Sequence, residues 1–277
     1  MTTGNGGRGG RNGSGRGGAG RSGRSGGGSG DPIAGQRMVK QRVRTAGRRS
    51  ASSTRWLERQ LNDPYVVAAK REGYRSRAAF KILQLDEKYG LLKPGQRVVD
   101  LGAAPGGWTQ IAVDRTKAGR AGGGRVVGID LLPVEPIEHA TLIQLDFLDD
   151  AAPDLLKQAL GGPADLVLSD MAPQTSGHPQ VDHLRIMHLL EIALDFAAEV
   201  LAEDGAFVAK VFRGGAEGDL VKRMQRLFRT VKHMKPAASR PESSEMYVIA
   251  QGFRPEVAAA ERAREGREAD GRGEAEG

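Results

Sequence analysis

Four aspartates each end a short apolar segment of the chain, and carboxylates in that position can bind ligands. They are Asp100, Asp130, Asp146 and Asp170. If the apolar segments are strands of an open α/β sheet, the acids meet at its carboxyl edge, where such folds bind their ligands. There Asp130 could accept hydrogen bonds from ribose hydroxyls, Asp146 could reach an adenine amino group, and the carboxylates could stabilise a cation. A single acid at a strand end is usually only the start of a polar loop, but four together favour a cofactor site.

The loop after Asp100 leads from a predicted strand at 97–101 into a helical pattern that resumes at Trp108. Gly102 and Gly106 bracket this loop. The dinucleotide fingerprint G-x-G-x-x-G has a further glycine between these two, which lets a pyrophosphate approach the backbone. Its absence disfavours an NAD-dependent enzyme and favours a nucleoside without a diphosphate, such as S-adenosylmethionine. An ordinary tight turn in an α/β sheet is the structural alternative.

Alternating strands and helices would bring these residues together. The apolar patterns predict seven strands, at 97–101, 125–130, 140–146, 165–170, 205–212, 230–236 and 244–253. Helices are predicted at 54–61, at 76–89 with Ser76 as the N-cap, and at 108–115, 182–201 and 217–228. Because no helix separates the last two strands, they should pair antiparallel. The sequence therefore predicts an α/β fold, a doubly wound and mostly parallel seven-stranded sheet with an antiparallel last strand.

The segments on either side of this domain differ from it in composition. Residues 1–60 hold 13 Arg and Lys but only 2 Asp and Glu, whereas the rest of the chain holds 28 and 32. Residues 1–50 are so rich in glycine and so poor in apolar side chains that we expect them to be disordered. Their arginines could attract phosphates, or the segment could be a solubilising spacer. We expect a domain at 54–253 with an N-terminal helical extension, and a charged flexible tail or frayed helix at 255–277.

Composition excludes several classes of protein. The chain has no cysteine, so it has neither disulfides nor cysteine-based metal sites. No apolar run approaches the ~20 residues of a membrane helix, and the N-terminus lacks the apolar core of a secretory signal. We therefore expect a soluble cytoplasmic protein. His178, Asp182, His183 and His188 lie close together, but His183 and His188 are five apart and share a helix face poorly, so we expect no metal site.

Five motifs follow one another along the chain: DLGAAPGGW, GIDLLP, SDMAPQTSG, KVFRGG and SEMYVIA. In this order and spacing they resemble the FtsJ-like family of S-adenosylmethionine-dependent ribosomal RNA 2'-O-methyltransferases. The resemblance runs from about Arg59 to Phe253 and leaves out both the Gly/Arg-rich head and the charged tail. It implies S-adenosylmethionine as the cofactor and the 23S RNA of the large ribosomal subunit as the partner. The implied acceptor is a ribose 2'-hydroxyl, that of an A-loop uridine, methylated late in subunit assembly. We expect a monomer.

The resemblance also implies which residues carry the reaction. The family's catalytic Lys-Asp-Lys-Glu set is matched by Lys81, Asp170, Lys210 and Glu245. The residues around S-adenosylmethionine are matched by Gly106, Trp108, Asp130, Asp146 and Asp170, and Gly102 belongs to the same loop. Because apolar neighbours on a buried strand disfavour a charged amine, we expect Lys210 to be the base or the group that polarises the hydroxyl. Lys81 and Glu245 would position the hydroxyl and Lys210.

Basic residues around the acceptor site could hold RNA phosphates, with Tyr74 stacking on a base. The candidates are Tyr74, Arg75, Arg77, Arg213, Lys222, Arg223, Arg226, Lys232, Lys235 and Arg240. A 2'-O-methyltransferase of transfer RNA or of the messenger RNA cap would share the catalytic set and stays open. So does a non-catalytic RNA-binding assembly factor, which would keep the basic head. A small-molecule methyltransferase would have no reason for two lysines at the site.

Overall fold

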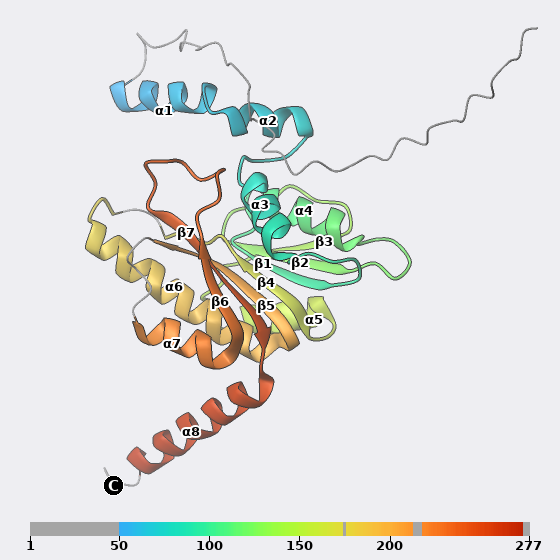
Figure 1. Ribbon diagram of the computed structural model, residues 1–277, viewed down its shortest axis with the longest axis vertical. Coiled ribbons are helices and arrows are strands. Elements are labelled where there is room, and N and C mark those ends of the chain that lie inside the picture. The colour runs from blue at the N-terminus through green and yellow to red at the C-terminus, as the bar shows by residue number, and fades with distance from the viewer. Residues whose placement is uncertain (1–49, 174–175, 213–217, 274–277) are drawn as a thin grey trace, which may run out of the picture. The chain divides into compact units, whose positions relative to one another are not determined.

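The structure is a computed structural model that describes residues 50–173, 176–212 and 218–273 (Figure 1). The predictions for residues 1–49 fall outside these ranges, as does Arg213 as an RNA contact.

Seven strands form one mixed sheet. They are β1 (Arg97–Leu101), β2 (Arg125–Asp130), β3 (Ala140–Gln144), β4 (Ala164–Ser169), β5 (Leu201–Phe212), β6 (Phe228–Met234) and β7 (Glu245–Phe253). Their order across the sheet is β3-β2-β1-β4-β5-β7-β6. β7 runs antiparallel to both of its neighbours, and all the other pairs are parallel. The predicted architecture is therefore confirmed, and the chain order reverses between β1 and β4, where open α/β sheets bind ligands.

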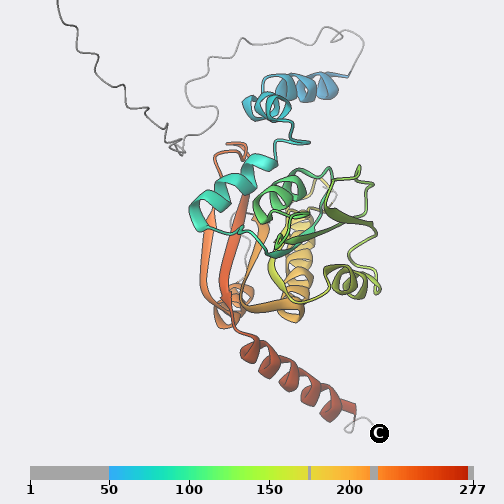
Figure 2. The same ribbon diagram turned by 90° about the vertical axis from the view of Figure 1, so that its right-hand side faces the viewer.

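Helices cover both faces of the sheet (Figures 1 and 2). One face carries α3 (Ala79–Tyr89) and α4 (Gly107–Thr116), and the other carries α5 (Ala152–Leu160), α6 (Pro179–Val200) and α7 (Gly218–Leu227). Val98 and Val99 show why both faces need a cover, because these neighbours on β1 are both fully buried, one in each core. A strand points successive side chains to opposite faces. Within the described ranges, no helix is long and apolar enough to span a bilayer.

The segment before α3 contains two helices where the sequence predicted one. α1 (Ala51–Leu61) ends before Asp63-Pro64, as expected, but α2 (Pro64–Glu72) begins there at once. The Asp63 carboxylate caps α2 by accepting a hydrogen bond from the Tyr65 backbone N–H at 3.0 Å, and Pro64 suits the first helical position. The same two residues thus end one helix and start the next.

The start of α3 differs from the prediction. The helix begins at Ala79, and no side chain caps it. Ser76 does not act as the N-cap, because it lies in the preceding turn, where its carbonyl accepts from the Ala79 N–H. Its buried hydroxyl has no partner among the described residues. The indole N–H of Trp108 on α4 instead donates to the Ala78 carbonyl at 2.8 Å and so holds this end of α3 to the domain.

Smaller differences lie at element ends and in the helix between β3 and β4. β3 ends at Gln144, so Asp146 lies in the following loop rather than on the strand. The short helix α5 was not predicted. The charged segment after the sheet forms α8 (Pro255–Gly273), in which Ala258 is buried against the core. Glu261 of α8 pairs with Arg223 and Arg226 of α7 at 3.1 Å each.

Candidate active site

A cavity of about 420 Å³ opens at the carboxyl ends of β1, β2 and β4. Its wall includes Gly102, Ile129, Asp130, Leu131, Asp146, Phe147, Leu148, Met171, Ala172, Pro173, Arg185, His188 and Leu189. Three of the predicted cofactor residues, Gly102, Asp130 and Asp146, therefore lie together as expected. Apolar side chains form most of the wall, with two carboxylates among them. That combination suits a nucleoside, which offers a flat apolar base and polar ribose edges.

Backbone hydrogen bonds hold the two cavity carboxylates in place. The Asp130 carboxylate accepts from the N–H of Ala104 in the glycine loop and from that of Leu132, both at 2.8 Å. Asp146 accepts from the Leu148 N–H at 3.0 Å. An ionised carboxylate has about four acceptor positions, so each can still accept from a ligand.

The glycine loop is shaped by close contacts. Gly102 has φ +80°, and a Cβ there would lie 2.8 Å from the Met171 side chain. Met171 lines the cavity, so a side chain at position 102 would disturb the wall directly. Gly106 has φ +109°, and a Cβ there would meet Ile137 at 2.8 Å. Gly106 is not among the lining residues of this cavity.

Trp108 lies in the core rather than on the cavity wall. It is 3% exposed, and its ring centroid is 5.5 Å from that of Tyr247. With its N–H bonded to Ala78, Trp108 links α4, α3 and β7. Contact of Gly106 and Trp108 with a cofactor stays a prediction, while their observed roles are to shape the loop and to anchor α3.

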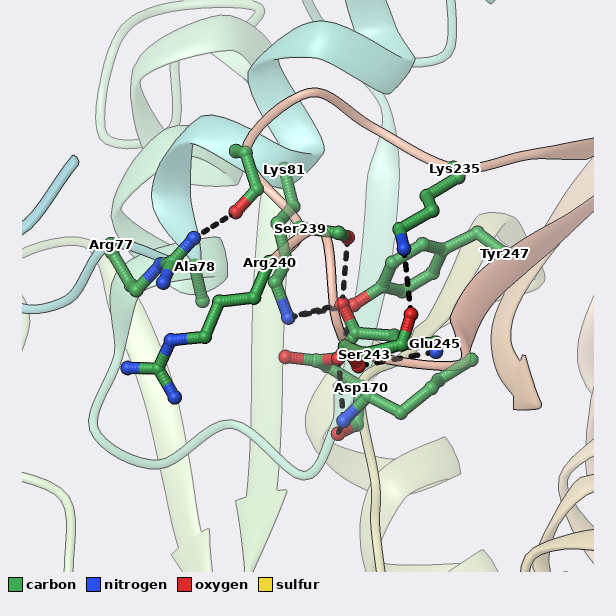
Figure 3. A network of polar contacts seen from close by, with 12 residues as sticks. Arg77, Ala78, Lys81, Asp170, Lys235, Ser239, Arg240, Ser243, Glu245 and Tyr247 are labelled. Carbon is green, nitrogen blue, oxygen red and sulfur yellow. Dashed lines mark hydrogen bonds and ion pairs between the residues drawn. The ribbon is translucent and has the colours of Figure 1, made fainter. Parts of the chain in front are cut away.

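The four predicted catalytic residues come together from four parts of the chain, and Figure 3 labels three of them, Lys81, Asp170 and Glu245. Lys81 Nζ on α3 lies 2.7 Å from Glu245 Oε1 on β7. Lys210 Nζ on β5 lies 2.8 Å from Asp170 Oδ1, just after β4, and also donates to the Asp170 carbonyl at 2.6 Å. Their side chains are between 9% and 17% exposed, so both ion pairs are largely shielded from water.

Tyr247 joins the two ion pairs, a role that we did not predict. Its hydroxyl donates to Asp170 Oδ1 at 2.6 Å and accepts from Lys81 Nζ at 3.2 Å. The sequence did hold a signal, because Tyr247 follows Glu245 by two residues on one strand and therefore points to the same face. Pairing of β7 with β5 sets Tyr247 opposite Lys210 and Glu245 opposite Phe212. The strand register thus assembles the site.

The electrostatics of this network fix where protons reside. Burial raises the pKa of Asp170, but Lys210, Lys81 and the hydrogen bonds from Lys210 and Tyr247 outweigh it and leave the pKa below its usual value. Burial, followed by the charges of Asp170 and Glu245, raises the pKa of Tyr247 well above its usual value. Asp170 is therefore ionised at neutral pH, and Tyr247 keeps its proton to donate to it.

Asp100 differs from the other strand-end acids because it is fully buried. Burial raises its pKa to about 7; the hydrogen bond from Thr109, 2.6 Å long, opposes this rise, and Asp170 and Asp130 add to it. Its Oδ1 has no partner among the described residues. Asp100 therefore lies beneath the glycine loop, against α4, and not on the cavity wall.

Most of the proposed RNA-binding side chains have partners within the chain. Arg75 donates to the carbonyls of Pro105, Glu135 and Pro136, at 3.4, 2.5 and 2.6 Å. Intramolecular contacts also engage Arg77, Lys222, Arg223, Arg226, Lys235 and Arg240. Tyr74 packs edge-on against Phe80. RNA contact by these residues stays a prediction.

The histidine cluster does not converge on one point. His178 precedes α6 as its cap, Asp182 accepts from the Ser176 N–H and hydroxyl at 2.6 and 2.7 Å, and His188 lines the cavity. Across residues 50–173, 176–212 and 218–273, no group of three or more His, Asp or Glu side chains could hold a metal ion.

The α/β fold and the two lysine–carboxylate pairs agree with the class of enzyme that the sequence motifs indicated, the methyltransferases. The chain belongs to the FtsJ-like methyltransferase family, whose pattern matches residues 74–253.

Similar proteins carry more specific names. A protein of Parvibaculum lavamentivorans named ribosomal RNA large subunit methyltransferase E is 60% identical over 234 residues, which cover 82% of this chain and 91% of the relative. A protein of the same name from Paramagnetospirillum magneticum is 61% identical over 228 residues, or 82% of this chain and 93% of the relative. The crystal structure of a protein described as a ribosomal RNA methyltransferase from Plasmodium falciparum matches with a TM-score of 0.57 and 29% identity. That match covers 65% of this chain and 98% of the other.

Proposed function

We propose that this chain transfers the methyl group of S-adenosylmethionine to a ribose 2'-hydroxyl of 23S ribosomal RNA in the large subunit, with an A-loop uridine as the acceptor. The observation that carries the proposal is the pairing of two lysines with two carboxylates beside a nucleoside-sized cavity. The names of the two bacterial relatives support large-subunit ribosomal RNA as the substrate. The proposal includes a cytoplasmic monomer that acts late in subunit assembly.

The cavity supports S-adenosylmethionine as the cofactor of this proposal. Its volume lies within the range of about 300–1,000 Å³ common for small-molecule sites. Asp130 would hold the ribose hydroxyls, Asp146 would accept from the adenine amino group, and Ile129, Phe147 and Leu148 would enclose the base. When bound, the cofactor supplies a methyl group already activated on a sulfonium centre.

The chain must supply orientation and a place for the hydroxyl proton. The acceptor oxygen has to be held in line with the methyl group, and such positioning accounts for a large part of the acceleration in group transfer. Lys210 would polarise the hydroxyl as the ammonium or take its proton as the free amine. Asp170 orients Lys210 from 2.8 Å, and Lys81, paired with Glu245, would hold the acceptor from the other side.

A direct test incubates the protein with radiolabelled S-adenosylmethionine and large subunits from a strain that lacks this modification. We expect label in 23S RNA at one ribose, mapped by primer extension at low deoxynucleotide concentration. Absence of label from the ribosomal RNA would contradict the proposal.

Two further reactions of the same experiment distinguish the proposed function from the alternative functions. Transfer RNA and capped messenger RNA replace the subunits in parallel reactions, and label in either one without label in 23S RNA would reassign the substrate. A non-catalytic assembly factor would bind the subunits and transfer no label to any of the three.

A further inference from the structure

The Glu245 carboxylate accepts from a donor of the predicted catalytic set and also from a donor outside it. Its Oε1 accepts from Lys81 Nζ at 2.7 Å and from the Ser239 hydroxyl at 2.8 Å (Figure 3). Ser239 lies in the loop between β6 and β7 and is only 4% exposed. A buried hydroxyl that donates to a carboxylate of the proposed catalytic set indicates a role in the site as well as in the structure of the loop.

The residue before Ser239 is clamped from both sides by the segment that carries Lys81. Gln84 accepts from the Ala238 N–H at 2.8 Å, and Arg77 donates to the Ala238 carbonyl. Lys81 and Gln84 are three residues apart on α3 and lie on one side of the helix, and Arg77 lies in the turn just before it. The segment that presents Lys81 therefore also fixes the backbone that presents Ser239.

Hydrogen bonds within the loop hold its two ends together. Lys235 Nζ donates to the carbonyls of Pro241 and Ser243 at 3.0 and 2.6 Å. The Ser243 hydroxyl accepts from the Glu245 N–H at 3.2 Å. Both the backbone and the carboxylate of Glu245 are thus restrained by the loop at 235–244.

We propose that Ser239 is a positioning residue that holds the Glu245 carboxylate against Lys81 and thereby sets the place of the Lys81 ammonium. A glutamate side chain has three rotatable torsions, and a second donor removes much of the freedom that one ion pair leaves. The inference rests on the proposed function, in which Lys81 and Glu245 orient the acceptor hydroxyl. It adds a residue of the β6–β7 loop to the machinery.

The kinetic test compares Ser239→Ala with Ser244→Ala in single-turnover methylation of large subunits. Ser244 lies exposed on the same loop and serves as the matched control. Losing a hydrogen bond to a charged group should slow transfer about tenfold in Ser239→Ala, with unchanged affinity for S-adenosylmethionine, whereas Ser244→Ala should behave as the wild type. Ser239→Thr should keep the rate better than the equally bulky Ser239→Val, which lacks the hydroxyl.

A double-mutant cycle separates positioning from a structural role. If Ser239 acts through Glu245, Ser239→Ala should have no further effect in a Glu245→Ala background. A wild-type rate for Ser239→Ala, or the full tenfold loss in the Glu245→Ala background, would overturn the inference.

Crystal structures of the wild type and of Ser239→Ala test the positioning without any activity. The inference expects the Glu245 carboxylate to leave hydrogen-bonding distance of Lys81 Nζ in the variant, and an unmoved carboxylate would refute it. If the wild type transfers no methyl group to ribosomal RNA, the proposed function fails, while these structures still decide whether Ser239 positions Glu245.

Discussion

At the scale of single residues, Lys210 is the side chain that the proposed mechanism places on the acceptor hydroxyl. Its ammonium is fixed by two oxygens of Asp170, the carboxylate at 2.8 Å and the carbonyl at 2.6 Å. Its side chain is 9% exposed, so few water molecules compete for it. A group held in this way is already placed before the acceptor arrives, which is the condition for electrostatic and proton-transfer catalysis.

We expect Lys210→Ala to lower the single-turnover rate by about two to four orders of magnitude, the usual range for loss of an acid–base group. Affinity for S-adenosylmethionine should be retained, because Lys210 does not line the cavity. Calorimetry of cofactor binding and rapid-quench methylation measure the two effects. The exposed Lys93→Ala variant is the control. A near wild-type rate in Lys210→Ala would remove Lys210 from the mechanism.

Asp100 makes stability depend on pH. Its pKa is raised from 3.8 to about 7 in the folded state, mainly by burial. Between these values the folded protein keeps a proton that the unfolded chain has lost, so the folded state is favoured at the acidic end. This contribution is lost as the pH rises through about 7.

The Asp100→Asn variant is neutral throughout and should escape this loss. We expect the unfolding free energy of the wild type, relative to the variant, to fall between pH 5 and pH 8 by about 3 kcal/mol at most. Urea denaturation of both proteins at the two pH values measures the difference. A constant difference between them would show that Asp100 does not change its protonation in this range.

At the scale of elements, the site depends on how α3 is held to the sheet. Lys81 is carried by α3, whereas its partners Glu245 and Tyr247 belong to β7. Trp108 connects the two elements, since its N–H binds Ala78 at 2.8 Å and its ring packs near that of Tyr247. A change at Trp108 should therefore reach Lys81 through the position of the helix.

We expect Trp108→Phe to lower the unfolding free energy by about 2 kcal/mol, from the lost hydrogen bond and the smaller ring. Methyl transfer should slow, while affinity for S-adenosylmethionine should stay near that of the wild type. Calorimetry and denaturation test both statements. A large loss of cofactor affinity in a folded variant would instead support the family-based prediction that Trp108 contacts the cofactor.

The glycine loop offers a second test at this scale. We expect Gly102→Ala to weaken cofactor binding strongly, because its Cβ would lie 2.8 Å from Met171 on the cavity wall, in addition to the strain at φ +80°. Gly122→Ala is the matched control, since Gly122 has φ +69° but no atom within 4 Å of the added Cβ. Equal effects of the two substitutions on affinity for S-adenosylmethionine would argue against the wall contact.

At the scale of the whole molecule, positive charge is distributed unevenly along the chain. Residues 1–60 hold 13 of the 41 Arg and Lys, with only 2 of the 34 Asp and Glu. Many basic side chains of the domain, including Arg75, Arg77 and Arg223, are already engaged within it. We therefore expect the N-terminal segment to add to the affinity for RNA.

Removal of residues 1–49 should weaken binding to large-subunit RNA and reduce the slope of log K against log salt, because fewer counterions are released. Affinity for S-adenosylmethionine should not change. Filter binding over a range of KCl concentrations measures the slope. An unchanged slope would favour the alternative that this segment is a solubilising spacer.

The sequence by itself determined the fold class and the strand order along the chain, and it predicted the nucleoside-binding loop, while the catalytic candidates came from the resemblance to a known family. Apolar periodicity, glycine spacing and strand-end acids are properties of neighbouring residues, so they can be read locally. The sequence analysis missed α2, which begins at Asp63-Pro64, and the short helix α5. Both helices are only nine residues long, and so short a segment gives a weak helical pattern in the sequence.

Only the tertiary structure decided how these residues meet. Lys81 and Tyr247 are 166 positions apart, and their contact depends on the β5–β7 register and on the packing of α3. The same packing buries Asp100, places Trp108 in the core and brings Ser239 to Glu245. The physical reason is that the burial of a residue and its hydrogen-bond partners depend on segments that are distant in the sequence. The residues next to it along the chain do not encode them.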